Sequence, residues 1–385
     1  MHLDLFAPFD LGGLTLANRM VMAPMTRNRA DSDGCVSHLM VAHYRQRATA
    51  GLIIAESTTV SPKAVGYPFT PGLYTGAHAA SWRHLTDAVH AEGSRIFVQL
   101  QHCGRVSHPS LLNGQTPVAP SALAPAGQAV TYTGPQDFVV PRALEAGELP
   151  EVVVQFRRTA ELAKQAGFDG IEVHAGNGYL IDQFLRDGTN HRSDTYGGSA
   201  ANRMRLLNEV LDAVCEQWPA ERVGARLMPE NGFNSMSDSD PQGHFDYFLG
   251  QLSARGLSYA HVLEGDMATT TTSVDYQALW TRFAGVYIGN NGYDLARAQA
   301  AVNSGYTDLV AFGTPFIANR DLVRRYRESI QLTEADPATF YCGGEAGYTD
   351  CPFHQGDGAR TPALATAAQY SVAPRSGLDV LPPVN

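Results

Sequence analysis

Residues 170–185 read GIEVHAGNGYLIDQFL, and this stretch joins a buried strand to a polar turn. Its nearly unbroken apolar start is typical of a strand that is covered on both faces of a parallel sheet. An imidazole, an amide and a phenol then follow at His174, Asn177 and Tyr179. A strand that only built a core would end in ordinary turn residues, so we interpret this turn as part of a functional site.

Strands of the same kind recur along the whole chain. Eight nearly unbroken apolar runs of strand length lie at 19–24, 51–57, 95–100, 170–174, 223–228, 259–264, 285–289 and 308–313. Helical patterns lie between them, at 37–49, 79–91, 149–166, 201–218, 244–254, 295–304 and 321–328. Gly167, Gly256 and Gly305 follow three of these helices and are typical of helix C-termini. Eight strands with interleaved helices predict an α/β fold, a (β/α)₈ TIM barrel.

An open, doubly wound sheet is the alternative, but no GxGxxG follows the first strand, which disfavours its dinucleotide-binding form. Residues 101–148 are too many for an ordinary loop and are rich in Pro, Ala and Gly. We expect them to form a lid or hairpin insertion after strand three. Residues 266–283 show only a weak helical pattern. We expect one barrel domain over 1–352 and a poorly ordered C-terminal tail over 353–385.

Composition excludes several classes of function. The formal charge is −10 over 385 residues, which argues against a nucleic-acid surface, because phosphate binding needs a basic patch. No apolar run approaches the length of a membrane span, and the N-terminus does not resemble a secretory signal. Five cysteines without a CxxC argue against a disulfide framework or a zinc site. We therefore expect a cytoplasmic protein, monomer or homodimer, that acts on a small molecule.

Polar residues gather where the predicted strands end, which is where barrel active sites lie. Each also has a structural interpretation. Arg226 could neutralise a core carboxylate or bind an anionic ligand, Gln99 could cap a strand end, and Tyr179 could pack at the start of a helix. His102 and His108 bracket a turn, but they lack a third ligand, so we expect no metal there.

Six longer stretches carry a more specific pattern. They are NRMVMAPMTRNRA at 18–30, VQLQHCGRVSHPS at 98–110, AGFDGIEVHAGNGYLIDQFLRDGTNHRSDTYGGSAANR at 166–203, VGARLMP at 223–229, DLVAFGTPFIANRDLV at 308–323 and TFYCGGEAGYTD at 339–350. Together they resemble the old yellow enzyme family of flavin-dependent ene-reductases, with the closest similarity to the bacterial nitroester and enone reductase branch. The resemblance covers about residues 5–352. It implies a (β/α)₈ barrel that holds FMN at its C-terminal face.

The resemblance also implies roles for individual residues. His174 and Asn177 would donate hydrogen bonds to the carbonyl or nitro oxygen of an activated alkene, and Tyr179 would protonate its α-carbon. NADPH or NADH would supply the electrons. The implied flavin-binding residues are Pro24, Met25, Thr26, Ser57, Gln99, Arg226, Asn291, Gly313 and Thr314, and the implied substrate-pocket residues are Tyr67, Gln101 and Tyr341.

Three positions depart from the family pattern. Thr314 stands where the family usually has an Arg that pairs with the FMN phosphate. Asn291 lies in the turn whose amides usually cradle the same phosphate. Loss of one charge-assisted phosphate contact costs about 1.5–3 kcal/mol. Arg297 and Arg320 are the nearest cations along the sequence. Gln101 replaces a bulky aromatic residue, which should open and polarise the pocket.

Two functions are consistent with these residues. The first is reduction of an activated C=C with FMN. The alternative is a specialised biosynthetic member that acts on a bulky substrate as an isomerase, dehydrogenase or cyclisation enzyme, with weakly held FMN or none. The altered phosphate cradle and Gln101 motivate the alternative. A non-catalytic binding barrel is disfavoured, because nothing selects a proton donor in a binding module.

Overall fold

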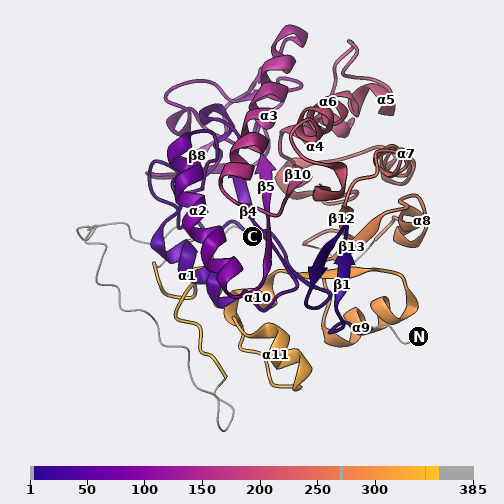
Figure 1. Cartoon of the computed structure of the whole chain (residues 1–385). Helices are drawn as coiled ribbons and strands as arrows, with labels where there is room; N and C mark the ends of the chain where they lie inside the picture. Colours follow the sequence, from indigo (N-terminus) through magenta and orange to yellow (C-terminus); the bar gives the residue numbers. More distant parts are fainter. Residues whose placement is uncertain (1–3, 269–271, 343, 355–385) are drawn as a thin grey trace.

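A closed barrel of eight parallel strands forms the centre of the molecule (Figure 1). The computed structural model describes residues 4–268, 272–342 and 344–354. Around the barrel the strands are β3 (Met20–Met22), β4 (Leu52–Thr59), β5 (Arg95–Gln101), β10 (Gly170–Ala175), β11 (Val223–Leu227), β12 (Tyr259–Leu263), β13 (Val286–Asn290) and β14 (Leu309–Phe312). Each of the eight predicted runs forms one barrel strand, so the predicted TIM barrel is confirmed.

Helices follow the strands along the chain and surround the barrel (Figure 1). They are α1 (His38–Gln46), α2 (Gly76–Ala91), α3 (Leu149–Gln165), α4 (Leu180–Leu185), α5 (Ala200–Arg203), α6 (Arg205–Cys215), α7 (Pro241–Ser253), α8 (Tyr276–Thr281), α9 (Leu295–Ser304), α10 (Thr314–Ala318) and α11 (Leu322–Arg327). The predicted helix at 201–218 is wrong in one respect, since it is divided between α5 and α6. The three predicted glycine stops are confirmed, because Gly167, Gly256 and Gly305 all have positive φ.

One end of the barrel is filled with apolar side chains. The hairpin of β1 (Phe9–Leu11) and β2 (Leu14–Leu16) packs into a buried cluster with Phe97 and Tyr259. Gly170 and Gly224 make room for these two rings, since a Cβ on either glycine would lie within 2.3 Å of a ring atom. The apolar plug leaves the carboxyl ends of the strands as the open end of the barrel.

The segment at 101–148 contains four short strands. β6 (Val118–Ala119) pairs with β9 (Arg142–Ala143), while β7 (Gln128–Thr131) and β8 (Gly134–Asp137) form an antiparallel hairpin. Phe138, directly after β8, packs against a buried cluster that includes Tyr179. This segment therefore reaches the predicted site, and its action as a lid stays a prediction.

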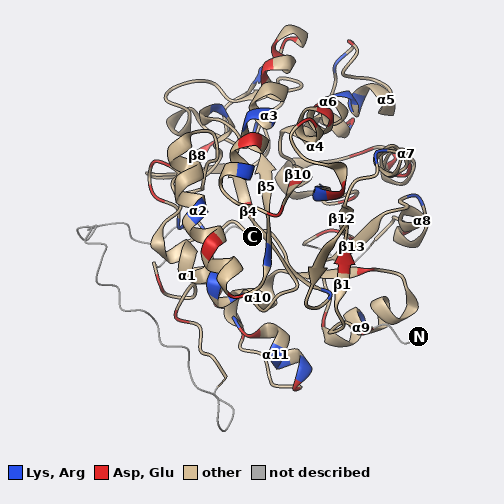
Figure 2. Cartoon of the chain, in the orientation of Figure 1, with Lys and Arg blue, Asp and Glu red and all other residues tan. Residues whose placement is uncertain are grey.

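The outer layer carries charges of both signs; helix α3, for example, has acidic and basic side chains interspersed (Figure 2). Among the residues that the structure describes, none of the helices combines the length and apolarity that a bilayer span requires. Of the tail predicted over 353–385, residues 355–385 lie outside the described part of the chain.

Candidate active site

The turn between β10 and α4 carries three predicted catalytic side chains. His174 is in β10, Tyr179 is the N-cap of α4, and Asn177 lies between them with φ 57°. Asn tolerates this left-handed conformation better than most residues. Gly178, with φ 73°, is required, because a Cβ there would lie 2.8 Å from side-chain atoms of Asn234 and Met236. The sharp turn therefore holds three polar side chains at the open end of the barrel.

Polar side chains fix the backbone of this turn. Asp182 accepts a hydrogen bond from the Gly178 N–H at 2.8 Å, and Gln183 donates to the Gly178 carbonyl at 2.7 Å. Asn234, from the loop after β11, donates to the Asn177 carbonyl at 2.7 Å. Because these bonds come from two separate elements, the position of the turn is determined before any ligand binds.

The protonation states of His174 and Tyr179 follow from their burial. Burial, with the Arg226 charge next, holds the pKa of His174 well below its usual value, so the imidazole is neutral. Burial also holds the pKa of Tyr179 well above 10. The Tyr179 hydroxyl donates to the Tyr67 hydroxyl at 3.2 Å. The centroid of the His174 imidazole lies 5.3 Å from the centroid of the Tyr179 ring. The site thus combines a neutral imidazole with a phenol that stays protonated.

A buried polar network lies in the barrel interior beneath the turn. Ser57 donates to Gln99, and Gln99 donates to Glu172 at 2.7 Å. His261 contacts the other carboxylate oxygen of Glu172 at 2.8 Å. Burial acts to raise the pKa of Glu172, but the His261 contact and the nearby Arg226 charge outweigh it, so this pKa is lowered. Glu172 is therefore an anion in the core.

Glu172 and His261 are functional candidates that the sequence analysis missed. A signal was present, because each is a titratable residue within an apolar strand, in GIEVH and in YAHVL.

Both explanations that the sequence left open for Arg226, a core carboxylate partner and an anionic ligand, retain support. A core carboxylate does lie near it, yet Arg226 donates to Asn290 at 3.1 Å rather than to Glu172. Its Nε is buried without a hydrogen-bond partner among the described residues.

The predicted flavin-binding residues surround one barrel mouth. Pro24, Met25 and Thr26 follow β3, and Gly313 follows the adjacent strand β14. A Cβ on Gly313 would lie 3.5 Å from the Met25 sulfur, so the two strand ends are in contact. The Pro24 carbonyl accepts from Arg226 at 3.4 Å. A buried guanidinium with a free N–H, at a mouth lined by backbone, fits a planar group with an anionic edge such as reduced FMN.

The two arginines nearest the predicted phosphate region along the sequence, Arg297 and Arg320, differ in their contacts among the described residues. Thr314 is exposed at the start of α10. The Asn291 side chain donates to the carbonyl of Glu264 at 2.8 Å, and Arg297 pairs with the Glu264 carboxylate at 3.0 Å. Arg320 stacks over an aromatic ring of the C-terminal segment, 5.5 Å from its centroid. Arg297 is therefore already paired with a carboxylate, whereas Arg320 makes the ring contact and its Nε is buried without a hydrogen-bond partner among the described residues.

The predicted pocket residues lie around Tyr179. Tyr67 contacts it directly. Gln101 is buried, and its amide donates to the thiol of Cys103, which belongs to the same apolar cluster as Tyr179. Tyr341 is 41% exposed at the rim and is near enough to interact electrostatically with Tyr67 and Tyr179. The structure therefore brings all three predicted pocket residues to one place.

Metal-ligating residues gather elsewhere. Asp187, Asp238 and His244 have ligand atoms within 4.8 Å of one another. His102, one of the two histidines considered from the sequence, instead accepts a hydrogen bond from the backbone of Gly104. We assign no metal to Asp187, Asp238 and His244, because Ser239 donates to Asp187 and the His244 ring contacts one oxygen of Asp238.

Comparison with known proteins agrees with this geometry. Residues 4–333 match the model of the NADH:flavin oxidoreductase / NADH oxidase family. The chain belongs to this family. A probable flavin mononucleotide-dependent alkene reductase from Leishmania infantum is 43% identical, over 90% of this chain and 96% of its own length. The 12-oxophytodienoate reductase 1 of Oryza sativa subsp. japonica is 41% identical, over 91% and 93% respectively.

Solved members of the family share the whole fold. Morphinone reductase superposes with a TM-score of 0.91 at 45% identity, covering 94% of this chain and 99% of its own. The old yellow enzyme homologue from Zymomonas mobilis superposes with a TM-score of 0.88 at 40% identity, covering 91% and 99%. The resemblance to the old yellow enzymes is therefore confirmed, while the nitroester branch stays a prediction.

Proposed function

We propose that this family member reduces an activated C=C bond of the enone type, with FMN as cofactor and NADPH or NADH as electron donor. One observation carries the proposal. A neutral imidazole, an amide and a protonated phenol converge on one rigid turn at the barrel mouth. The names of the relatives, an alkene reductase, a 12-oxophytodienoate reductase and a morphinone reductase, support this chemistry.

His174 and Asn177 would bind the oxygen of the substrate. The imidazole Nδ1 is buried without a hydrogen-bond partner among the described residues, and it sits on the same turn as the Asn177 amide. Two neutral donors aimed at one carbonyl oxygen stabilise the charge that builds there as the β-carbon accepts hydride. Because the donors are held in place beforehand, little reorganisation accompanies that charge.

Tyr179 would deliver the proton to the α-carbon. Its phenol keeps its proton at every physiological pH, because burial raises its pKa. Tyr67 accepts from this phenol at 3.2 Å, and by rotating its own hydroxyl it can donate to the phenolate that protonation of the substrate leaves behind. Rotation of both hydroxyls would thus turn the Tyr179 proton to the substrate and let Tyr67 stabilise the resulting phenolate.

When bound, FMN supplies the hydride. The residues that would hold it are those at the mouth: Pro24, Met25, Thr26, Ser57, Gln99, Arg226, Asn291, Gly313 and Thr314. Arg226 would balance negative charge at the pyrimidine edge of the flavin. Hydrogen bonds with Ser57 and Glu172 would hold the Gln99 amide in place for its own contact with the flavin.

The test is the purified protein itself. We expect it to carry FMN, seen as absorbance near 450 nm that is general to flavins. With dioxygen excluded, we expect it to turn over NADH or NADPH only when an enone such as 2-cyclohexenone is present as the electron acceptor. A colourless protein that still converts a bulky substrate would favour the biosynthetic alternative. A cytoplasmic location, a monomeric or homodimeric state and the lid action of 101–148 stay predictions.

A further inference from the structure

Asn177 has a partner that the sequence does not reveal. Asn231, in the loop after β11, donates from its side-chain nitrogen to the Asn177 side-chain oxygen at 3.1 Å. Asn231 is buried, with 2% of its surface exposed. An amide whose oxygen is occupied in this way presents its two N–H donors elsewhere. The remaining direction for the Asn177 donors is the barrel mouth.

The orientation of Asn231 is itself set by backbone. Its side-chain oxygen accepts the Phe233 N–H at 3.4 Å, and its nitrogen also lies 3.6 Å from the Met228 sulfur. The two ends of an amide are distinguished only by their hydrogen-bond partners. A backbone N–H can only donate, so it determines which end of Asn231 faces Asn177.

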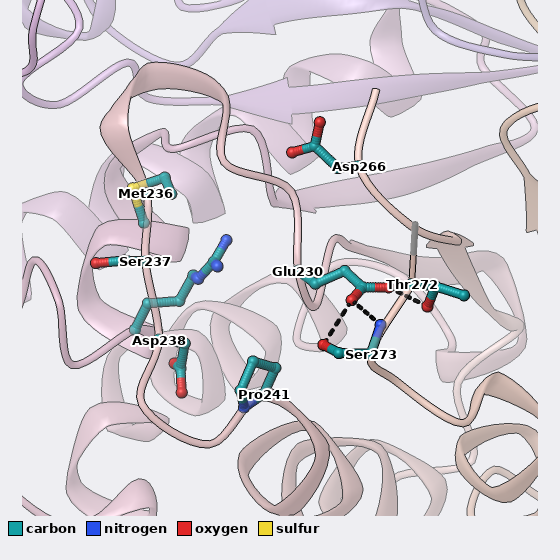
Figure 3. A pocket seen from close by; sticks show the side chains of 9 residues that line it. Glu230, Met236, Ser237, Asp238, Pro241, Asp266, Thr272 and Ser273 are labelled. Carbon is teal, nitrogen blue, oxygen red and sulfur yellow. Dashed lines mark hydrogen bonds between the residues drawn. The ribbon is translucent and has the colours of Figure 1, made fainter. Parts of the chain in front are cut away.

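The loop that carries Asn231 is anchored on both sides. Arg186 donates to the Asn231 carbonyl at 2.7 Å. On the outer side, Asp266 accepts from the Gly232 N–H at 2.6 Å, and Glu230 accepts from the backbone and hydroxyl of Ser273. Figure 3 shows Glu230 hydrogen-bonded to Thr272 and Ser273 in the lining of a cavity of about 470 Å³. These bonds hold the loop in place, so Asn231 cannot easily move away to let the Asn177 amide rotate.

We propose that Asn231 is a positioning residue that locks the Asn177 amide with its N–H donors toward the substrate oxygen. The inference rests on the proposed function, in which Asn177 is an oxyanion donor. A reversed amide would present its carbonyl oxygen to the developing anion and would repel it. Asn231 makes that reversal costly, because two NH₂ groups would then face each other in a buried place and neither would have an acceptor.

Three variants separate orientation from packing and charge. Asn231→Leu keeps the volume and removes the donor. Asn231→Asp keeps the shape but offers only acceptors, which favours the reversed Asn177 amide. Ser235→Asp is the matched control, because it places the same charge in the same loop, and a carboxylate there can still accept the Ala126 N–H that the Ser235 hydroxyl accepts. Asn177→Ala reports on the proposed function separately.

The readouts are the Kd of the FMN-loaded protein for 4-hydroxybenzaldehyde and the kcat and KM for 2-cyclohexenone. The flavin spectrum and thermal midpoint verify the fold. We expect Asn231→Leu to weaken binding about fivefold, the size of one neutral hydrogen bond, and Asn231→Asp at least about tenfold. In both, kcat should fall more than KM rises, because the donor acts mainly on the charge of the transition state.

The affinities of the variants for 4-hydroxybenzaldehyde support or overturn the positioning role of Asn231. If the isosteric Asn231→Asp is no worse than Asn231→Leu, orientation is not what Asn231 provides and the inference fails. It also fails if Ser235→Asp weakens binding as much as Asn231→Asp, since charge alone would then explain the loss. If Asn177→Ala leaves Kd unchanged, the oxyanion role itself is refuted, and the inference with it. A loss in Asn177→Ala without any loss in the Asn231 variants overturns the inference alone.

Discussion

Replacing Tyr179 with Phe tests the proton donor most directly. The side chain is 7% exposed, and Phe has nearly the same shape, so the change leaves no cavity. What it removes is one neutral hydrogen bond to Tyr67, worth about 1 kcal/mol, which would change a rate about fivefold at most. Loss of a general acid instead costs about 10²–10⁴-fold. The two explanations of a slow variant therefore differ by at least about 20-fold.

The assay measures the two half-reactions separately by anaerobic stopped flow. In Tyr179→Phe, reoxidation of the reduced flavin by 2-cyclohexenone should slow by at least about 100-fold. Reduction of the flavin by NADH should change less than about twofold, because the phenol donates its proton only to the alkene. Tyr67→Phe is the matched control, since it alters the same hydrogen bond and leaves the donor in place. Equal losses in both half-reactions of Tyr179→Phe would make Tyr179 a structural residue.

Three further changes test other parts of the site. His174→Ala and Asn177→Ala should each weaken phenol binding about five- to tenfold along with turnover, measured by flavin difference spectra; unchanged affinity in both would place the oxyanion site elsewhere. Thr314→Arg should tighten FMN about ten- to 100-fold in apoprotein titrations, with little effect on riboflavin, and equal gains for both flavins would contradict a phosphate contact. Burial raises the pKa of Asp182 to about 6. The protonated side chain therefore contributes to the free energy of unfolding below about pH 4, and this contribution is lost as pH rises through about 6. Asp182→Asn should therefore gain up to about 3 kcal/mol over the wild type in urea unfolding at pH 8 but not at pH 4, and a pH-independent difference would refute the assignment.

The barrel could be predicted from the sequence because its strands are buried on both faces. Such strands appear as continuous apolar runs, and long outer helices such as α3 keep a clear amphipathic period. The sequence did not predict α4, because all six of its residues are buried and no polar face marks a helical period. It did not predict α10 either, which has only five residues after Gly313.

The candidate site also has a part that could be predicted from the sequence and a part that could not. His174, Asn177 and Tyr179 are close along the chain, so one stretch of sequence was enough to group them. Asn231 comes from a different strand end, and its contact with Asn177 depends on how two loops meet above the barrel.

Glu172 shows why spatial contacts matter for function. From the sequence it is one charge within an apolar strand, and such a charge is costly to bury alone. In the fold it receives hydrogen bonds from β5 through Gln99 and from β12 through His261. Gln99 is also one of the predicted flavin contacts, so the buried anion fixes that amide with its oxygen turned toward Ser57. A strand-borne carboxylate and a loop-borne amide would thus act alike in this barrel, because each hydrogen-bonds a side chain that we predict to face the ligand.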